Sequence, residues 1–388
     1  MGVFICGHEM MSAAGHGSAS CFQNLLPHLP TDSAHNPVYD LHHDSEQVLK
    51  KLLESEEGKT LAEYDRAAQI LAATSLLLRT KSRIPQDRSR FGAVIATSRG
   101  ATGLLEKAVS QYLAFEKVRP KTSPLTSSGI FASLVAHLWG LEGGQFTISS
   151  TCTSGLNAIG IGFHLIKSGL FDHCLTGGSE SALTPFSSSM MSAAKVTATS
   201  KTDRLESMGA SAKGMILGEG AALIYLSTQQ QPETFAQIRA FSMTTESAGL
   251  TGITETGEAL QQAMQRALSE AGWTSSELDL IVPHGSGTQR GDAAEARAYQ
   301  HFFSNRNSPL PPIFPTKWKT GHTLGAAGTQ SVCFALEALR NNKINLPPYP
   351  LLAELHSNLL QREIKKIMIC ALGFGGGASC LLIEKIAH

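Results

Sequence analysis

Short apolar runs alternate along this chain with longer stretches that predict helices. The apolar runs at residues 146–148, 172–177, 278–282 and 381–383 predict strands. The stretches at residues 154–167, 258–271 and 292–303 predict helices. Strands that alternate with helices in this way indicate an α/β fold whose sheets are largely buried.

A polar stretch divides the chain into two halves. Residues 227–232, Ser-Thr-Gln-Gln-Gln-Pro, follow the apolar run at residues 221–226. A polar segment that contains proline is typical of a connection between folded units. Each half shows the same alternation, so we expect an internal duplication with halves at residues 1–230 and 231–388, although no residue-level repeat is visible.

Composition narrows the class of protein. The 388 residues contain 32 Lys plus Arg and 32 Asp plus Glu, a formal net charge of 0. A balanced chain lacks the basic footprint of a nucleic-acid or membrane-surface binder. Charged residues make up 16%, against roughly 25% in typical soluble domains, so we expect a large core or a subunit interface. No apolar run reaches the ~18 residues that a membrane span needs.

The cysteines give little sign of metal binding. All seven are scattered, and none forms a Cys-x-x-Cys pair. We therefore expect neither a zinc site nor a disulfide framework. A reduced, cytoplasmic protein follows as the expectation, with most cysteines as small core residues.

Cys152 has a setting that differs from those of the other cysteines. It lies in Ser-Ser-Thr-Cys-Thr-Ser-Gly, between a predicted strand and a helix that begins near Ser154. The free N–H groups at a helix start stabilise a thiolate and can bind a developing oxyanion. A cysteine in this position is often structural, but Cys152 is also the first candidate for a nucleophile.

His284 follows the predicted strand at residues 278–282, in a loop rich in Gly, Ser and Thr. Asp292 and Glu295 lie on the first turn of the next predicted helix. Ligands bind at this edge of the sheet in open α/β folds. His284 is therefore either a satisfied core histidine or a functional group.

His322 precedes Gly-Ala-Ala-Gly at residues 325–328, and Lys317 lies five residues before it. Small side chains on the first turns of a helix let it pack close to a neighbour. We therefore expect His322 to lie deep in the protein.

The glycine-rich segment at residues 373–378 matches the dinucleotide pattern G-x-G-x-x-A. Only eleven residues remain from Ala378, the last residue of the pattern, to His388. They leave no room for the helix and the later acidic residue that this fingerprint needs. We interpret the segment as a backbone turn beside an active site, with Phe374 at its centre.

Taken together and in order, five residues resemble the β-ketoacyl–acyl-carrier-protein synthases, condensing enzymes of the thiolase superfamily: Cys152, His284, Lys317, His322 and Phe374. The resemblance covers almost the whole chain, through residues 3–7, 177–180, 217–221 and 373–376. It implies a thiolase-like fold of duplicated α-β-α-β-α layers.

The resemblance also implies an activity, the decarboxylative Claisen condensation of an acyl group on Cys152 with malonyl-acyl-carrier protein. His284 and His322 would hydrogen-bond the malonyl thioester carbonyl, and Lys317 would orient them. The backbone N–H groups of Cys152 and Phe374 would form the oxyanion hole. The implied partner is acyl carrier protein, whose phosphopantetheine carries the substrates, and neither a cofactor nor a metal is implied.

The family further implies a homodimer or a heterodimer with a ketosynthase-like subunit. The uncharged segment at residues 143–150 would pair edge to edge with its counterpart. Phe186 and Met191 would line the acyl pocket beside that interface.

Three segments depart from the family pattern. Ser331 stands where many relatives have a glutamate that engages the lysine, so we expect Asp292 or Glu295 to form an ion pair with Lys317. Residues 207–212 lack the usual Pro-Phe-Asp-x-x-Arg, and Gly-Ala replaces Thr-Asn at residues 377–378. These changes suggest aryl-polyene or other type II polyketide synthesis rather than fatty-acid elongation.

Two alternatives stay open. A non-catalytic subunit, like the chain-length factors that pair with ketosynthases, would share the fold but lack the nucleophile. A degradative thiolase would carry a second cysteine in a C-terminal Cys-x-Gly turn, where this chain has Gly373-Phe374-Gly375.

Overall fold

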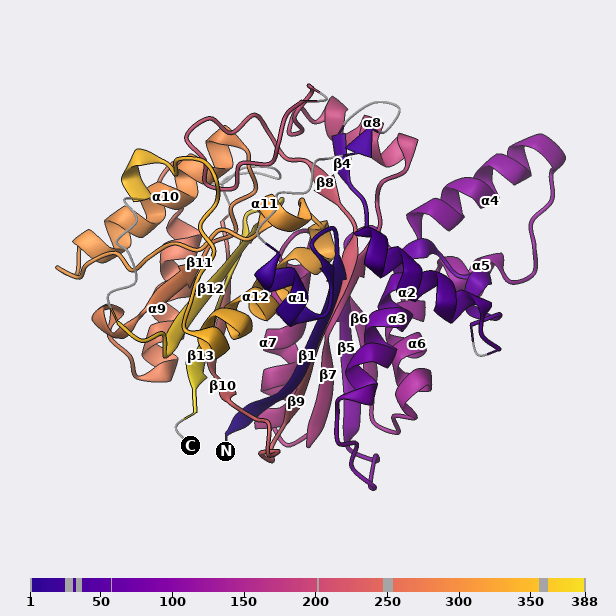
Figure 1. The fold of residues 1–388 in the computed structure, drawn as a ribbon, viewed down its shortest axis with the longest axis horizontal. Helices are drawn as coiled ribbons and strands as arrows, with labels where there is room; N and C mark the ends of the chain where they lie inside the picture. The colour runs from indigo at the N-terminus through magenta and orange to yellow at the C-terminus, as the bar shows by residue number, and fades with distance from the viewer. Residues whose placement is uncertain are drawn as a thin grey trace.

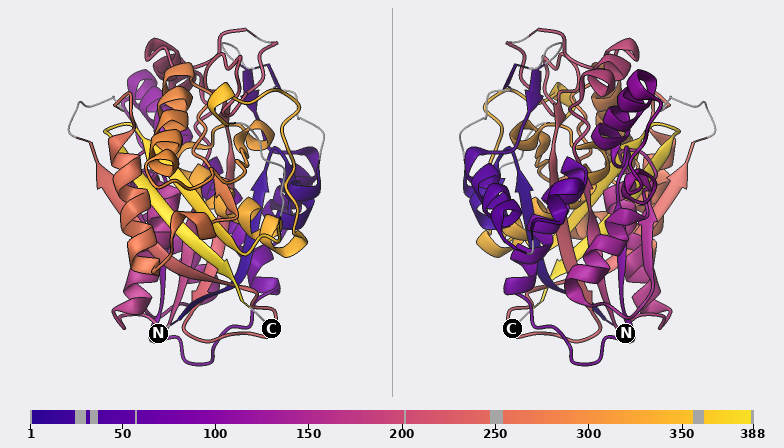
Figure 2. Two further views of the ribbon diagram at one scale, coloured as in Figure 1. Left: turned by 90° about the vertical axis from the view of Figure 1, so that its left-hand side faces the viewer. Right: turned by 90° about the vertical axis from the view of Figure 1, so that its right-hand side faces the viewer.

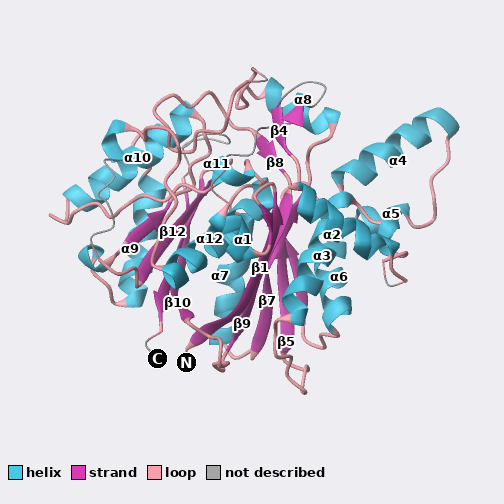
Figure 3. Ribbon diagram, in the orientation of Figure 1, coloured by secondary structure: helices cyan, strands magenta, loops and turns pink. Residues whose placement is uncertain are grey.

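The computed structural model describes residues 2–24, 31–32, 37–56, 58–200, 202–246, 254–355 and 362–386. A large mixed sheet runs through its centre with helices on both sides (Figures 1 and 3). The strands follow the order β11-β12-β13-β10-β1-β9-β7-β5-β6, and β2 pairs with β1. Three antiparallel residue pairs between β1 and β10, from Val3–Ile238 to Ile5–Ala236, join two half-sheets.

The two half-sheets share one connectivity. In each, the first strand pairs antiparallel with the last, the last pairs antiparallel with the strand before it, and that strand pairs parallel with an earlier one. The first half-sheet contains β1 (Val3–Ser12), β5 (Phe91–Ala96), β6 (Gln145–Ile148), β7 (His173–Glu180) and β9 (Gly220–Ser227). The second contains β10 (Ala236–Thr245), β11 (Leu280–Val282), β12 (Lys366–Gly373) and β13 (Gly377–Lys385).

Helices form three further layers around the half-sheets. α7 and α12 pack against each other, and each contacts strands of both half-sheets. α3 and α6 cover the outer face of the first half-sheet, and α9 covers that of the second, with α10 packed on α9. Their bounds are α3 (Arg66–Thr80), α6 (Ile130–Trp139), α7 (Ser154–Lys167), α9 (Glu258–Ala271), α10 (Gln289–Ser304) and α12 (Ala327–Asn341).

The remaining elements lie around these layers, and Figure 2 shows them from the two sides. The helices are α1 (Ser18–Gln23), α2 (His43–Glu54), α4 (Thr102–Phe115), α5 (Thr122–Thr126), α8 (Pro185–Ala193) and α11 (Lys317–Thr320). The 3-10 turns are η1 (Leu61–Glu63), η2 (Ser275–Glu277), η3 (Leu324–Ala326) and η4 (Ala353–Leu355). A separate small sheet consists of β3 (Thr31–Asp32), β4 (Pro37–Tyr39) and β8 (Leu217–Gly218). β2, which pairs with β1 in the large sheet, spans Gly15–His16.

The predicted α/β fold with duplicated α-β-α-β-α layers is confirmed. The expected bounds of α7 and α9 agree with the structure, whereas α10 begins three residues earlier than residue 292. The repeated connectivity supports the division at residues 230 and 231, which stays a proposal. The low charged fraction agrees with a large core. Every residue of the central helix α12 from Ala327 to Leu339, for example, is buried. No helix in the described ranges is both long and apolar enough to cross a bilayer.

Candidate active site

A strained turn places Cys152 between β6 and α7. Thr151 has a φ of 55°, in the left-handed region that non-glycine residues seldom adopt. The Ser154 hydroxyl holds the turn, because it accepts from the Ser150 N–H at 2.7 Å and donates to the Thr151 carbonyl at 2.6 Å. Cys152 is buried at the end of this turn, just before the helix begins.

Burial decides the resting state of Cys152. Removal from water raises the pKa of its thiol to about 12, although the positive charge of Lys317 acts in the opposite direction. The negative charge of Glu180 adds to the rise. This raised pKa favours the thiol form of Cys152 in the resting protein.

Glycines let α7 approach the segment that carries His322. A Cβ added at Gly155 would lie 2.8 Å from the Gly325 carbonyl oxygen, and one at Gly328 would lie 2.6 Å from the Leu156 nitrogen. His322 is 1% exposed, as the small residues predicted. Its N–H donates to the Ile216 carbonyl at 2.8 Å, which fixes the backbone just before η3.

The rings of His284 and His322 lie against each other, with centroids 5.3 Å apart and planes at 72°. Nδ1 of His322 accepts from the Leu324 N–H at 3.0 Å, so the proton of the neutral ring is on Nε2. Burial and the charge of Lys317 lower the pKa of both histidines well below the usual range. Both rings are therefore neutral, and His322 presents an N–H donor.

Leu324 connects this histidine pair to Cys152. Its backbone contacts His322, while its side chain belongs to the same apolar cluster as Cys152. Lys317 lies close enough to interact electrostatically with Cys152 and with both histidines. The expected catalytic residues therefore converge on one buried region.

Lys317 finds a different partner from the one we expected. Its buried ammonium donates to the His284 carbonyl oxygen. Within the described residues, no ion pair connects Lys317 to Asp292 or Glu295, so the expected ion pair is wrong. Burial lowers the pKa of Lys317 to about 8, while the more distant charges of Glu295 and Asp292 raise it.

Asp292 and Glu295 are engaged by backbone N–H groups instead. Glu295 accepts from the N–H groups of His284 at 2.7 Å and Gly285 at 2.8 Å. Asp292 accepts from the N–H groups of Met208 at 2.7 Å and Gly287 at 3.1 Å. The two carboxylates hold the His284 loop in place, and they interact with Lys317 only by longer-range electrostatic attraction.

Two of the sequence departures have local explanations. The Ser331 hydroxyl lies 3.3 Å from that of Thr316, the residue before Lys317, so the side chain at this position pairs with a neutral hydroxyl. The segment at residues 207–212 is still tied to the histidine loop, because the Ser207 hydroxyl donates to the Gly285 carbonyl at 2.7 Å. Gly209 and Leu351 form a β-bridge on its other side.

Glu180 is a structural residue of the site that sequence reasoning did not single out. Its buried carboxylate accepts from the N–H groups of Ser98 at 2.7 Å and Gly325 at 3.1 Å. Burial raises its pKa to about 7. Glu180 thereby connects the ends of β5 and β7 to η3, directly after His322. The sequence feature that could have identified Glu180 is its position as an acidic residue at the end of a strand of mostly small and apolar residues.

The glycine-rich segment is the hairpin between β12 and β13, which confirms that it is not a dinucleotide-binding turn. The Thr151 hydroxyl donates to the Phe374 carbonyl at 3.1 Å. A Cβ at Gly373 would lie 2.3 Å from that hydroxyl oxygen and 3.5 Å from the Cys152 nitrogen. The hairpin therefore lies directly beside the Cys152 N–H group.

The cluster around Cys152 contains one of the two expected pocket residues. It consists of Cys152, Ala182, Met215, Leu217 and Leu324, with Leu183, Met191 and Val196 packed against it. Phe186 lies outside this cluster and is 59% exposed on α8. Its role in an acyl pocket therefore stays a prediction.

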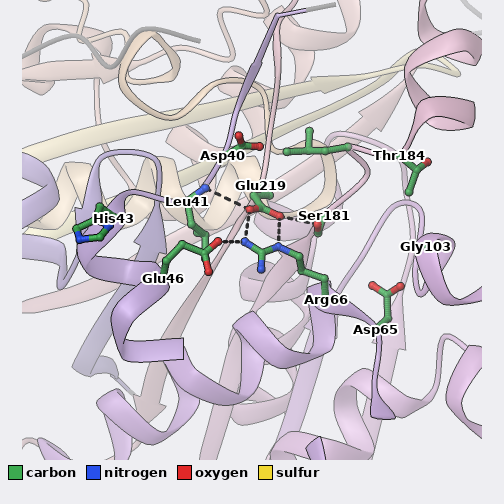
Figure 4. Close-up of a pocket in the computed structure, with 11 residues that line it drawn as sticks. Asp40, Leu41, His43, Glu46, Asp65, Arg66, Gly103, Ser181, Thr184 and Glu219 are labelled. Atoms are coloured by element: carbon green, nitrogen blue, oxygen red, sulfur yellow. Dashed lines mark hydrogen bonds and ion pairs between the residues drawn. The ribbon is translucent and has the colours of Figure 1, made fainter. Parts of the chain in front are cut away.

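A separate cavity of about 630 Å³ opens near α2, α3 and the residues after β7 (Figure 4). Arg66 lies at its centre, where its guanidinium donates to Glu219 and Glu46. The Ser181 hydroxyl also donates to Glu219, at 2.6 Å. Leu183 is shared by this cavity and the cluster around Cys152, so the two regions are neighbours.

Comparison with known proteins agrees with this arrangement. The family model for the β-ketoacyl synthase N-terminal domain matches residues 29–231, and that for the C-terminal domain matches residues 235–348. The chain therefore belongs to the β-ketoacyl synthase family, as the sequence resemblance predicted.

Two curated relatives and one solved structure show the range of similar proteins. A putative polyketide β-ketoacyl synthase 1 from Streptomyces halstedii is 27% identical, with 84% of this chain and 83% of the relative covered. A 3-oxoacyl-[acyl-carrier-protein] synthase 2 from Vibrio harveyi is 28% identical, over 78% and 77%. The structure of a type II polyketide acyl-carrier protein with its ketosynthase, AntDE:AntF, aligns with a TM-score of 0.87 at 18% identity, covering 99% of both chains.

We predict that Gly373→Ala slows acylation of Cys152 by roughly tenfold or more, because a new methyl group would displace the Thr151 hydroxyl and the adjacent N–H donors. The rate of acyl transfer from a carrier-protein thioester, followed by intact-protein mass spectrometry, measures this effect. Gly377→Ala is the matched control, since its Cβ would meet nothing closer than 3.7 Å. Equal rates for the two variants would contradict the role of the hairpin.

Proposed function

We propose that this protein catalyses the decarboxylative Claisen condensation of an acyl group, held on Cys152, with malonyl-acyl-carrier protein. The product is a β-ketoacyl-acyl-carrier protein. One observation carries the proposal: two neutral, buried histidines lie ring to ring beside Lys317, in the same region as a buried cysteine at a helix start. This set of residues fits a reaction in which carbon dioxide leaves and an enolate must be stabilised.

In the first half-reaction, the Cys152 sulfur attacks the acyl thioester carbonyl, the bond to the carrier sulfur breaks, and the Cys152 thiol proton passes to the departing carrier thiolate. A thiol suits this exchange because sulfur is a good nucleophile and also a good leaving group. We assign the developing oxyanion to the backbone N–H groups of Cys152 and Phe374. The contact between Gly373 and Cys152 supports this assignment.

In the second half-reaction, malonyl thioester loses carbon dioxide and the resulting enolate attacks the acyl carbonyl on Cys152. The bond to the Cys152 sulfur breaks, and the released thiolate takes up a proton to restore the thiol. His284 and His322 are assigned to the thioester carbonyl, whose oxygen gains negative charge. Neutral imidazoles can donate hydrogen bonds to that oxygen, and fixed donors are worth roughly 3–4 kcal/mol each in such sites. Lys317 holds the His284 backbone, and burial together with the Lys317 charge keeps both rings neutral.

The family relatives include fatty-acid and polyketide enzymes, and we propose acyl carrier protein as the substrate carrier for this chain. The departures at Ser331 and at residues 207–212 favour a specialised pathway such as type II polyketide or aryl-polyene synthesis. A panel of carrier-protein thioesters with saturated and polyene chains, each paired with malonyl carrier protein, would identify the preferred chain.

We predict that acyl-carrier-protein thioester adds one acyl mass to the protein and that Cys152→Ala abolishes this adduct. His284→Ala and His322→Ala should slow condensation by roughly 10²-fold or more, while acylation of Cys152 is largely retained, because the oxyanion hole consists of backbone groups. Mass spectrometry of the protein and of the carrier-bound product measures the two half-reactions separately.

Cys333→Ala provides the control for the adduct, because Cys333 is buried in α12 away from the proposed site. An adduct that persists in Cys152→Ala contradicts the assignment of the nucleophile. A wild-type protein that is never acylated would instead favour a non-catalytic subunit similar to a chain-length factor.

We predict that condensation declines as the pH rises through about 8, because Lys317 loses its proton there. The ammonium is charged below this pKa, so activity is retained on the acidic side and lost on the alkaline side. Ser331→Glu should move the decline to higher pH, because a nearby carboxylate favours the charged lysine. Ser331→Ala is the control, and a pH–rate profile that is the same in all three proteins would refute the assignment.

We also propose that the protein is a dimer formed through β6 and α4. β6 pairs only with β5 among the described strands, and its Phe146 side chain is exposed. α4 extends away from the body of the protein (Figure 1) and exposes apolar side chains, among them Val109, Tyr112 and Leu113. An unpaired strand edge and an exposed apolar helix face are each typical of a subunit interface.

Light scattering should therefore give a mass near twice 41.3 kDa. Leu113→Asp should shift the protein toward the monomer, because a charge in a desolvated interface is unfavourable. Leu346→Asp, at an exposed apolar residue outside α4, should leave the dimer intact. A monomer that gains activity only with a second ketosynthase-like chain would indicate a heterodimer, and a fully active monomer would contradict the interface.

A further inference from the structure

Lys319 is a second buried lysine on the short helix α11, and the proposed chemistry gives it no role. Its side chain points to α1, where Nζ donates to the carbonyl oxygens of Phe22 at 2.8 Å and Cys21 at 3.5 Å. Lys319 is 2% exposed, and no ion pair reaches it from any described residue. An ammonium in this position costs free energy that an apolar side chain would not.

Partial charges replace the missing carboxylate. The two carbonyls belong to the last turn of α1, where helix carbonyls lack intrahelical partners and carry partial negative charge. Nζ also lies 5.3–5.9 Å from the ring centroids of Trp318, Phe334 and Phe22, within the range of cation–π attraction. Cys21 is the titratable group that faces it, and burial raises the pKa of that thiol to about 12.

The two lysines of α11 hold opposite sides of the same helical turn. Lys317 donates to the His284 carbonyl on one side, and Lys319 donates to α1 on the other. The chain then passes through Gly321, whose N–H donates to the Lys317 carbonyl at 2.8 Å, directly into His322. A shift of α11 would therefore move Lys317 and His322 together relative to His284.

We propose that Lys319 is a positioning residue that anchors α11 to the C-terminal end of α1 and thereby keeps Lys317 and His322 aligned with His284. The inference rests on the proposed function, since it concerns the step assigned to the histidines. Acylation of Cys152 depends on the β6–α7 turn and the β12–β13 hairpin, so it should be much less sensitive to Lys319.

Lys319→Met tests this role because methionine fills much of the same volume without a donor or a charge. We expect the rate of malonyl-carrier-protein decarboxylation to fall by roughly tenfold to a hundredfold, the scale of a misplaced catalytic group. The rate of Cys152 acylation should change by less than about threefold. Lys319→Gln, which restores an N–H donor, should recover part of the decarboxylation rate.

Asn345→Ala is the matched control. The Asn345 amide also donates to the Phe22 carbonyl, but Asn345 is not part of α11. Loss of this contact should lower thermal stability without a change in the ratio of decarboxylation to acylation. If Asn345→Ala lowers that ratio as much as Lys319→Met does, the effect comes from α1 itself and the proposal is wrong.

Further outcomes are equally decisive. Equal loss of both half-reactions in Lys319→Met, or loss of neither, overturns the positioning role. Should Lys319→Met fail to fold, Lys319→Ala, which also removes the donor and the charge, is compared with Asn345→Ala in the same way, and an unchanged ratio overturns the role. A wild-type protein that neither acylates Cys152 nor decarboxylates malonyl carrier protein refutes the proposed function itself, before any variant is compared.

Discussion

The close contact between α7 and the η3–α12 segment is the constraint on which the rest of the site depends. At Gly155 and Gly328, an added Cβ would come within 3 Å of backbone atoms of the opposite segment. Only hydrogen fits at such positions, and overpacking of this kind typically costs about 1–3 kcal/mol. Because Cys152 lies just before α7 and His322 lies just before η3, this crossing brings together two residues that are 170 positions apart in the sequence.

A single peptide group then determines where His284 lies. In the peptide group between His284 and Gly285, the Gly285 N–H donates to Glu295, and the His284 carbonyl accepts from the Lys317 ammonium. The Glu295 carboxylate therefore lies beside the partial positive charge of the N–H group, and the Lys317 ammonium lies beside the partial negative charge of the carbonyl, on opposite sides of one peptide group. This arrangement separates them, so the charge of Lys317 is not neutralised by direct contact and continues to act on both histidine rings.

Local patterns in the sequence were enough to predict the helices that carry the site, but not the contacts within it. The bounds of α7 and α9 follow from their periodicity and from the Gly, Ser and Thr residues at their ends. The ion pair expected for Lys317 was wrong because the carboxylates of Asp292 and Glu295 are engaged by backbone N–H groups of loops that the sequence does not place. Glu180 was missed for the same reason, since its partners come from two segments that are distant in the sequence, residues 97–99 and Gly325.

The substitution at Ser331 has a consequence for the electrostatics of the whole site. A carboxylate at this position would neutralise part of the Lys317 charge, whereas the Ser331–Thr316 hydroxyl pair leaves it in place. Burial, and after it the charge of Lys317, lowers the pKa of His284 and His322, and the same charge opposes the rise that burial causes in the pKa of Cys152. Burial also lowers the pKa of Lys317 itself to about 8, against the opposing effect of the charges of Glu295 and Asp292. One buried lysine without a direct ion pair therefore supports the neutral state of both histidines and is itself the group of the site that loses its proton near pH 8.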